Sequence, residues 1–421
     1  MNEHIIKSLR VRQEIEAAGF KPVLEELVVK LHSCAYAERT VSLYEQGAVH
    51  FAFWLARQQH IGPSEVKEGH INSFLSRHLS RCHCPVDGVR EYHTVRAALV
   101  HFEAVLRSAG YVSSLQREAP DVVDIEVQRF DNYLRLTAGL QEVTRTYRSR
   151  YVREFLKGFF GDEAVDLFRL APKDVVRYVS KRASRLKPAS ANVLASSLRS
   201  YFRFLRLNGQ CDEALTLAVP TSASRRLASL PRVLTDDEVK QLLAVFNRKT
   251  VAGRRDYAIT RCLTDLGLRA EEVARLRLDD IDWRKGTLRI VGTKSRRDDE
   301  LPLTAAIGGA IAAYILRGRP QTSERQVFVR LRAPVGQGMT RRTVSDMIVR
   351  AAARAGMEST VTGTRILRHT AATRMLRHGA SIKEVADVLR HRSLDTTAIY
   401  AKVDLPRLAA VAMPWPKENS L

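Results

Sequence analysis

Residues 364–403 read TRILRHTAATRMLRHGASIKEVADVLRHRSLDTTAIYAKV. Apolar residues at helical spacing predict two helices in this stretch, over 368–379 and 381–391, and a glycine ends the first of them as a C-cap residue should. His391 is followed nine residues later by Tyr400. Two short helices therefore carry arginine and histidine side chains and a tyrosine follows them, and such groups can bind an anion and supply a nucleophile.

A phosphodiester is the kind of substrate that these groups suit. It resists attack because its nonbridging oxygens are negative and its leaving alkoxide is poor. A metal-free catalyst needs fixed cations on those oxygens, a nucleophile, and an acid for the leaving oxygen. Arginine suits the first task, since it stays charged and donates through a bidentate fork.

Two segments upstream hold further candidates for these roles. LTDLGLRAEEVARLRLDDID (263–282) places Arg269 after the end of a helix, with Glu272 three positions later. IVGTKSRRDDELPL (290–303) is typical of two short strands joined by a turn, and the turn contains Lys294. The second half of the chain thus offers cations, an acid and a nucleophile.

In this order the segments resemble the boxes of the tyrosine recombinase, or phage integrase, family over roughly residues 233–403. The resemblance implies that Arg269 and Arg368 clamp the scissile phosphate. It implies that Lys294 is the general acid for the leaving 5′ oxygen. Glu272 would be the carboxylate behind the arginines that holds the site together.

The resemblance also assigns the nucleophile. Tyr400 would attack a DNA phosphate, form a covalent 3′-phosphotyrosine link and release a 5′ hydroxyl. His391 would hydrogen-bond the phosphate, and His369 matches the common neighbour of the second arginine. Bond energy is kept in the covalent link, so the family's chemistry needs no ATP, metal or other cofactor.

One position departs from the family pattern. Where the family usually has histidine, this chain has Arg365. An arginine can donate to phosphate but cannot exchange a proton near neutral pH. The sequence leaves open whether Arg365 replaces the histidine in catalysis or marks weakened activity. Other basic residues nearby are expected in solvent or on the DNA backbone: Arg296, Arg297, Arg374 and Arg377.

The composition agrees with a nucleic-acid partner. The 421 residues include 68 lysines and arginines against 46 acidic residues, a formal net charge of +22. Such charge raises affinity for polyphosphates through counterion release, although it does not separate DNA from RNA or a membrane surface. Because no apolar run approaches the roughly 18 residues of a membrane span, and the amino terminus lacks a secretory signal, we expect a cytoplasmic protein. Its five cysteines are expected to be reduced.

The chain is long enough for two or three domains. Helical periodicity stops within residues 217–234, which are rich in serine and proline and predict a linker. Thr235 and Glu238 then form a capping box that starts a new helix. We expect a mixed α+β catalytic domain with a small antiparallel sheet over 235–404, and a docking tail over 405–421. Its further elements are expected as helices over 256–268, 305–318 and 343–356 and strands over 287–292 and 299–303.

The part before the linker is expected to be all-helical and duplicated. HFEAVLRSAGY (101–111) parallels YFRFLRLNGQ (201–210), and two other pairs of segments match at a similar offset near one hundred residues. We expect a core-binding (SAM-like) DNA clamp over 116–216 and a possible copy of it over 1–115. This arrangement and the unusual Arg365 favour a mobile-element enzyme.

A cluster of cysteine and histidine invites a zinc hypothesis. Cys82, His83 and Cys84 are consecutive, with His70 and His78 nearby. Structural zinc sites commonly pair Cys-x2-4-Cys with a second pair further on, and no clear second pair follows here. The spacing therefore favours a loop between helices without a metal.

The family resemblance implies double-stranded DNA with specific recombination sites as the partner. Because one protomer cuts one strand, it also implies a tetramer on two duplexes, alone or with related recombinases. Two alternatives stay open. A non-catalytic DNA-binding subunit is favoured by Arg365, and a type IB topoisomerase-like enzyme would relax supercoiled DNA without a specific site.

Overall fold

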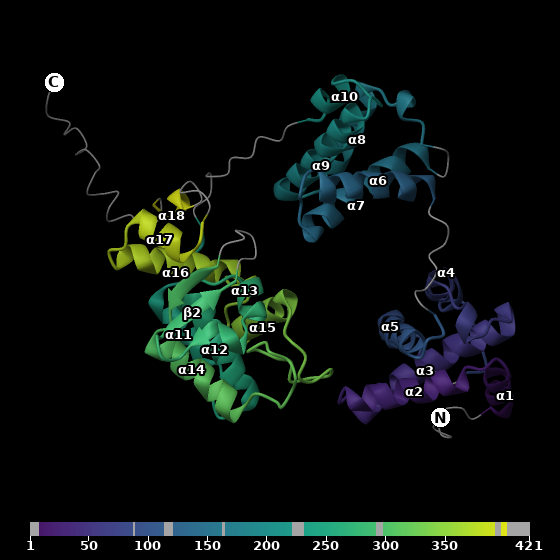
Figure 1. Cartoon of the computed structure of the whole chain (residues 1–421), viewed down its shortest axis with the longest axis horizontal. Coiled ribbons are helices and arrows are strands. Elements are labelled where there is room, and N and C mark those ends of the chain that lie inside the picture. The colour runs from purple at the N-terminus through teal and green to yellow at the C-terminus, as the bar shows by residue number, and fades with distance from the viewer. Residues whose placement is uncertain are drawn as a thin grey trace. The chain divides into compact units, whose positions relative to one another are not determined.

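A computed structural model of the chain describes residues 8–86, 89–112, 121–161, 165–220, 231–291, 298–391 and 397–401. The chain divides into two compact units, residues 1–27 with 43–226 and residues 28–42 with 227–421, and the second unit holds the sheet (Figure 1). Within the described residues, no helix combines the length and the apolar character needed to cross a bilayer. Lys294 of the proposed hairpin, the basic pair Arg296 and Arg297, and the tail over 405–421 lie outside these residues.

The first helical module covers residues 8–112. Its core contains the buried aromatic rings of Phe20, Phe51, Phe74 and Phe102, whose centroids lie 5.1–6.1 Å apart where they touch. Two of its helices continue into π-helical turns, Leu55–Gln59 and Phe74–His78, and a 3-10 turn covers Pro63–Glu65. The helices are α1 (Leu9–Ala17), α2 (Lys21–Ser33), α3 (Glu38–Trp54), α4 (Glu68–Ser73) and α5 (Tyr92–Ser108).

The second helical module covers residues 121–220 and has its own core. Tyr201 is fully buried there, and its hydroxyl donates to the buried carboxylate of Glu126 at 3.0 Å. Since a buried polar group is costly without a partner, this bond fixes how two helices pack. The helices are α6 (Val122–Leu136), α7 (Glu142–Phe160), α8 (Pro172–Ala183), α9 (Pro188–Leu207) and α10 (Ala214–Leu217), with a 3-10 turn at Leu167–Arg169.

The two modules have a parallel order of elements. Three helices precede a 3-10 turn in the first module and two in the second, and in each a shorter helix follows the turn and a long helix comes next. The long helices α5 and α9 both lead into a left-handed glycine, Gly110 with φ 76° and Gly209 with φ 68°. A duplicated module predicts this parallel at the offset seen in the sequence.

The C-terminal domain surrounds one large core with helices and carries a three-stranded antiparallel sheet in the order β1-β2-β3. Thr235 caps its first helix as the sequence predicted, accepting a bond from the backbone N–H of Glu238 at 3.2 Å. The helices are α11 (Asp236–Ala244), α12 (Val251–Asp265), α13 (Ala270–Arg275), α14 (Ala305–Arg317), α15 (Arg341–Arg354), α16 (Arg365–Arg377), α17 (Ile382–Val388) and α18 (Ala398–Ala401). The strands are β1 (Ile281–Asp282), β2 (Thr287–Ile290) and β3 (Asp299–Pro302), and a 3-10 turn covers Leu278–Asp280.

The expected mainly helical fold with a small sheet is confirmed, and the differences are local. β1 has only two residues, too few to show the alternation by which a strand is recognised. α12 begins five residues before the expected start, because Thr250 caps it by accepting from the backbone N–H of Gly253 at 3.0 Å.

Candidate active site

Arg269 stands at the start of α13, where the chain turns from one helix into the next. Its backbone N–H donates to Oε2 of Glu272 and its guanidinium Nη1 to Oε1, both at 2.7 Å. The Glu272 side chain is 2% exposed, whereas that of Arg269 is 32% exposed. The buried carboxylate therefore holds the arginine by its backbone and its side chain and leaves part of the guanidinium accessible.

Gly267 makes this turn possible. Its φ is 62°, a conformation that side chains disfavour, and a Cβ there would lie 2.6 Å from Cδ2 of Leu389 and 3.2 Å from Cβ of Ala371. Glycine is thus required by the backbone conformation and by close packing. The end of α12 can approach α16 and the residues after α17 because of it.

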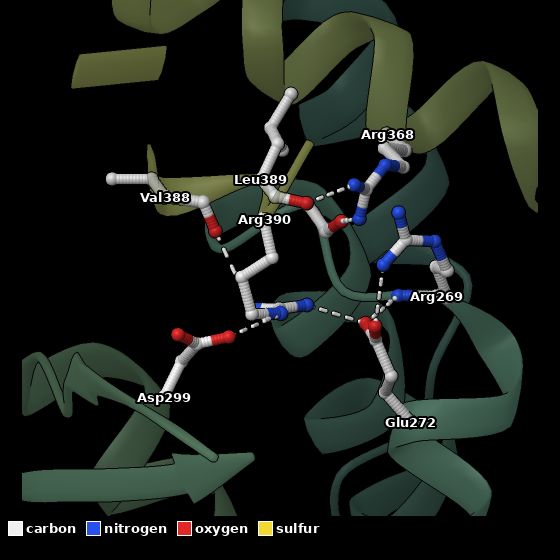
Figure 2. A network of polar contacts seen from close by, with 8 residues as sticks. Arg269, Glu272, Asp299, Arg368, Val388, Leu389 and Arg390 are labelled. Atoms are coloured by element: carbon white, nitrogen blue, oxygen red, sulfur yellow. Dashed lines mark hydrogen bonds and ion pairs between the residues drawn. The ribbon is translucent and has the colours of Figure 1, made fainter. Parts of the chain in front are cut away.

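Arg368 lies in the first half of α16 and is buried. Its Nη1 donates to the carbonyl of Gly267 at 2.6 Å, and its Nη2 donates to the carbonyl of Leu389 (Figure 2). Burial lowers the pKa of Arg368 to about 10, and the charge of Arg269 adds to this effect. The guanidinium stays charged at neutral pH and is fixed by backbone oxygens contributed by two other segments.

Arg390 is a site residue that the sequence did not reveal. It has a left-handed φ of 53°, its side chain is 5% exposed, and it donates to Glu272 Oε2 at 2.5 Å. Its Nε lies 4.0 Å from Oδ2 of Asp299 on β3, and Figure 2 shows Arg390 and Arg269 converging on Glu272. Burial lowers the pKa of Arg390, while Glu272 raises it. One buried carboxylate therefore holds two arginines.

Tyr400 lies on the short helix α18 and is 2% exposed. It packs in a small core with Ala372, Leu376, Val385 and Leu389. Burial raises the pKa of its hydroxyl, and the charges of Arg368, Arg365 and Arg269 oppose that rise. The cations near the phenol thus favour the phenolate that a nucleophilic attack requires.

A chain of polar contacts joins Arg365, His369 and Tyr400. Nε of Arg365 donates to Nε2 of His369 at 3.1 Å, and Nδ1 of His369 lies 2.9 Å from the Tyr400 hydroxyl. Burial, with Arg365 and Arg368, lowers the pKa of His369 to about 4, so its ring is neutral at pH 7. Because arginine can only donate, Nε2 must accept, and the single ring proton resides on Nδ1. His369 therefore donates to the Tyr400 oxygen.

His391 is a second histidine beside the Tyr400 ring. The two rings stack at 6.3 Å with an interplanar angle of 14°, and His391 Nδ1 lies 2.7 Å from Oγ1 of Thr397. Burial lowers the pKa of His391 to about 4, and Arg368, Arg269 and Arg390 contribute to the shift. Two neutral histidines thus flank the tyrosine.

The structure brings together most of the residues that the sequence singled out: Arg269, Glu272, Arg365, Arg368, His369, His391 and Tyr400. Arg374, expected in solvent or on the DNA backbone, is 33% exposed, and its Nε lies 2.9 Å from Oδ1 of Asp236. Arg377 is exposed, as expected. Three buried or half-buried arginines around one carboxylate leave the site positively charged, which suits an anionic phosphate.

Comparisons with known proteins agree with this geometry. The profile of the phage integrase family matches residues 232–406, and that of the phage integrase N-terminal SAM-like domain matches residues 127–209. A putative integrase/recombinase of Sinorhizobium fredii, y4rA, is 39% identical over 373 residues, which cover 88% of each chain. The tyrosine recombinase XerA of Thermococcus onnurineus is 31% identical over 68% of this chain and 94% of its own.

A solved structure shares the fold. It is the XerH site-specific recombinase bound to a palindromic difH substrate, with a TM-score of 0.54, 16% identity, and coverage of 88% of this chain and 95% of that chain. At this identity the likeness concerns the fold alone. From the two profiles and the long alignments with its relatives, the chain belongs to the phage integrase family of tyrosine recombinases.

Proposed function

We propose that this recombinase cuts and rejoins DNA at specific sites through a 3′-phosphotyrosine intermediate on Tyr400. The observation that carries the proposal is the convergence on the Tyr400 hydroxyl. His369 contacts it directly, and the charges of Arg368, Arg365 and Arg269 act on its ionisation. The phenol is the nucleophile, and the guanidinium groups of Arg269 and Arg368 bind the nonbridging oxygens.

The proposed cleavage step exchanges one phosphodiester for another. The Tyr400 oxygen forms a bond to phosphorus, the bond from phosphorus to the 5′ oxygen breaks, and the phenolic proton leaves to solvent. Lys294 is the proposed acid that gives the 5′ oxygen a proton. Rejoining is the reverse, with a 5′ hydroxyl attacking the phosphotyrosine, so no energy source is consumed.

Arg365 supports this mechanism in an unusual way. Because it holds His369 in the tautomer with a proton on Nδ1, His369 cannot take the proton of Tyr400 and instead donates to its oxygen. The pair thus stabilises the phenolate by a hydrogen bond and a nearby permanent charge. The proposed role of Arg365 is to replace proton transfer with electrostatic stabilisation.

The proposed substrate is duplex DNA that carries the recombination sites of a mobile element. The formal charge of +22 supports a polyphosphate partner. The solved XerH relative is bound to its DNA substrate, and it has the same fold. The second helical module is the proposed clamp on the DNA. Since each site holds one nucleophile, exchange of both strands between two duplexes requires four protomers.

The test uses a suicide DNA substrate, nicked near a candidate crossover in the DNA that flanks the gene, in a buffer without added metal. A covalent protein–DNA adduct on a denaturing gel is expected from the wild-type chain. Tyr400→Phe should bind the DNA as tightly and form no adduct, because only the hydroxyl is lost. Tight binding without an adduct in the wild type would instead favour the non-catalytic DNA-binding subunit.

A further inference from the structure

Two histidines and two cysteines meet inside the first helical module, apart from the recombinase site. His50 lies on α3, His78 ends the π-helical turn Phe74–His78, and Cys82 and Cys84 follow shortly after. One nitrogen or sulfur atom from each side chain lies within 4.8 Å of all the others. Within the described residues, this cluster combines four groups that are each able to bind a metal ion.

The distances in this cluster fit a tetrahedral ion. Cys82 Sγ lies 3.5 Å from Nε2 of His50, and Cys84 Sγ lies 3.3 Å from Nε2 of His78. In a tetrahedral zinc site, bonds of about 2.3 Å to sulfur and about 2.0–2.1 Å to nitrogen separate these atoms by about 3.6 Å. Two edges of the tetrahedron are therefore already close to the required length.

The core of the module fixes both imidazole rings. His50 is 1% exposed and packs edge-on against Phe74 at 5.0 Å, while the His78 ring stacks on the same phenyl ring at 5.2 Å. The His50 and His78 rings are 5.4 Å apart. His78 belongs to a π-helical turn, a rare geometry that occurs frequently at functional sites. The two nitrogen ligands thus lie on helical segments that the core holds, and the two cysteines follow in the non-helical stretch after the π-helical turn.

The chemistry of the four groups selects the ion. Two thiolates and two neutral imidazoles are a common ligand set of structural zinc sites. Two thiolate charges balance a divalent cation, so a filled site carries no net charge into the buried interior. Both cysteines are free thiols. We propose that His50, His78, Cys82 and Cys84 bind one zinc ion as a closed, structural site.

Spacing along the sequence hides this site. Cys82 and Cys84 are too close for the usual Cys-x2-4-Cys pair, and His50 precedes Cys82 by 32 residues. The expectation of a loop without a metal did not include His50, which the fold brings to the cluster. A bound zinc would join α3 to the segment after the π-helical turn and stabilise the module, because metal-binding free energy adds to folding free energy.

The first experiment measures zinc in the full-length chain, purified without metal-affinity resin, by mass spectrometry of the metal. Wild type is expected to hold about one zinc per chain. Cys84→Ser and His78→Gln are expected to lose it. His83→Ala is the matched control, because His83 lies between the two cysteine ligands and is exposed; it should keep the ion. Equal zinc content in Cys84→Ser and wild type would overturn the proposal.

A second experiment stays informative if the ligand variants do not fold. The wild-type chain is stripped of metal, kept reduced and titrated with Co²⁺. The absorption spectrum of bound Co²⁺ in the visible and near-ultraviolet range reports tetrahedral coordination and thiolate ligands. We expect two features in the spectrum, the d–d bands of tetrahedral Co²⁺ and the thiolate-to-cobalt charge-transfer band. Zn²⁺ should displace Co²⁺ and remove both. The metal-filled chain should unfold at a higher temperature than the metal-free chain. Absence of the thiolate band would overturn the site. Neither the zinc content nor the Co²⁺ spectrum depends on DNA cleavage. The zinc proposal can therefore fail or succeed independently of the proposed role of Tyr400.

Discussion

Arg365 shows how one substitution can change the chemistry around a nucleophile without removing it. A histidine at this position could give and take a proton, whereas arginine can only donate. By donating to Nε2 of His369, Arg365 keeps the ring proton on Nδ1, the nitrogen that faces Tyr400. Under the proposed mechanism, Tyr400 is then assisted by charge and by a donated hydrogen bond.

Two substitutions of Arg365 test whether its charge and its hydrogen bond to His369 assist Tyr400. Arg365→Met removes the donor to His369 and the cation near Tyr400, so adduct formation is expected to fall by about one to two orders of magnitude, with its pH profile moved upward. Arg365→His restores the family's usual residue and should form the adduct at a rate equal to or higher than that of wild type. Initial rates on the suicide substrate measure both. A Met variant as fast as wild type would contradict the proposed role.

At the scale of elements, Glu272 is the point where separate parts of the catalytic domain meet. As the third residue of α13 it caps the start of that helix, it binds Arg269 three positions earlier, and it binds Arg390, which lies 118 residues away. Arg390 in turn approaches Asp299 on β3. The carboxylate thus links a helix start, the segment after α17, and the edge of the sheet.

Removing the charge of Glu272 should lower the free energy of unfolding more than removing the charge of Glu271. Glu272→Gln leaves Arg269 and Arg390 buried or half-buried without their countercharge, and we expect the free energy of unfolding to fall by about 3 kcal/mol. Adduct formation should fall with it. Glu271→Gln is the control, because the pair of Glu271 with Arg275 is largely exposed and contributes less than about 1 kcal/mol. Urea unfolding of both variants measures the difference.

For the whole molecule, the sequence predicts elements better than long-range contacts. The helices over 305–318 and 343–356 are confirmed as α14 and α15 to within two residues at each end, because their periodicity and caps are local signals. The boxes also predicted Arg269 and Arg368 for one site, and in the fold they lie close enough for the charge of Arg269 to lower the pKa of Arg368. Arg390 and His50 escaped prediction, since their partners lie 118 and 32 residues away and no local pattern marks them.

Buried neutral histidines should make the folded chain sensitive to acid. His369 and His391 have a pKa of about 4 in the fold, against 6.5 normally, chiefly because burial disfavours their charged forms. The unfolded chain therefore binds protons first, so stability is complete above pH 6.5 and falls as the pH drops towards 4.

Thermal unfolding at about pH 7.5 and about pH 5 measures this loss. His391→Gln should reduce the dependence on pH, because one of the two groups is removed. His378→Gln, which alters an exposed histidine just after α16, should leave it unchanged. An equal dependence in His391→Gln and wild type would show that other groups control it.

The burial of Tyr400 has a consequence for the protein when it is not bound to a recombination site. A phenol that is 2% exposed cannot reach a phosphate from solvent, so α18 must shift before any strand is cut. A formal net charge of +22 favours binding to nucleic acid whatever its sequence. If Tyr400 is the nucleophile, as proposed, its burial prevents the hydroxyl from cutting DNA that is bound without sequence preference.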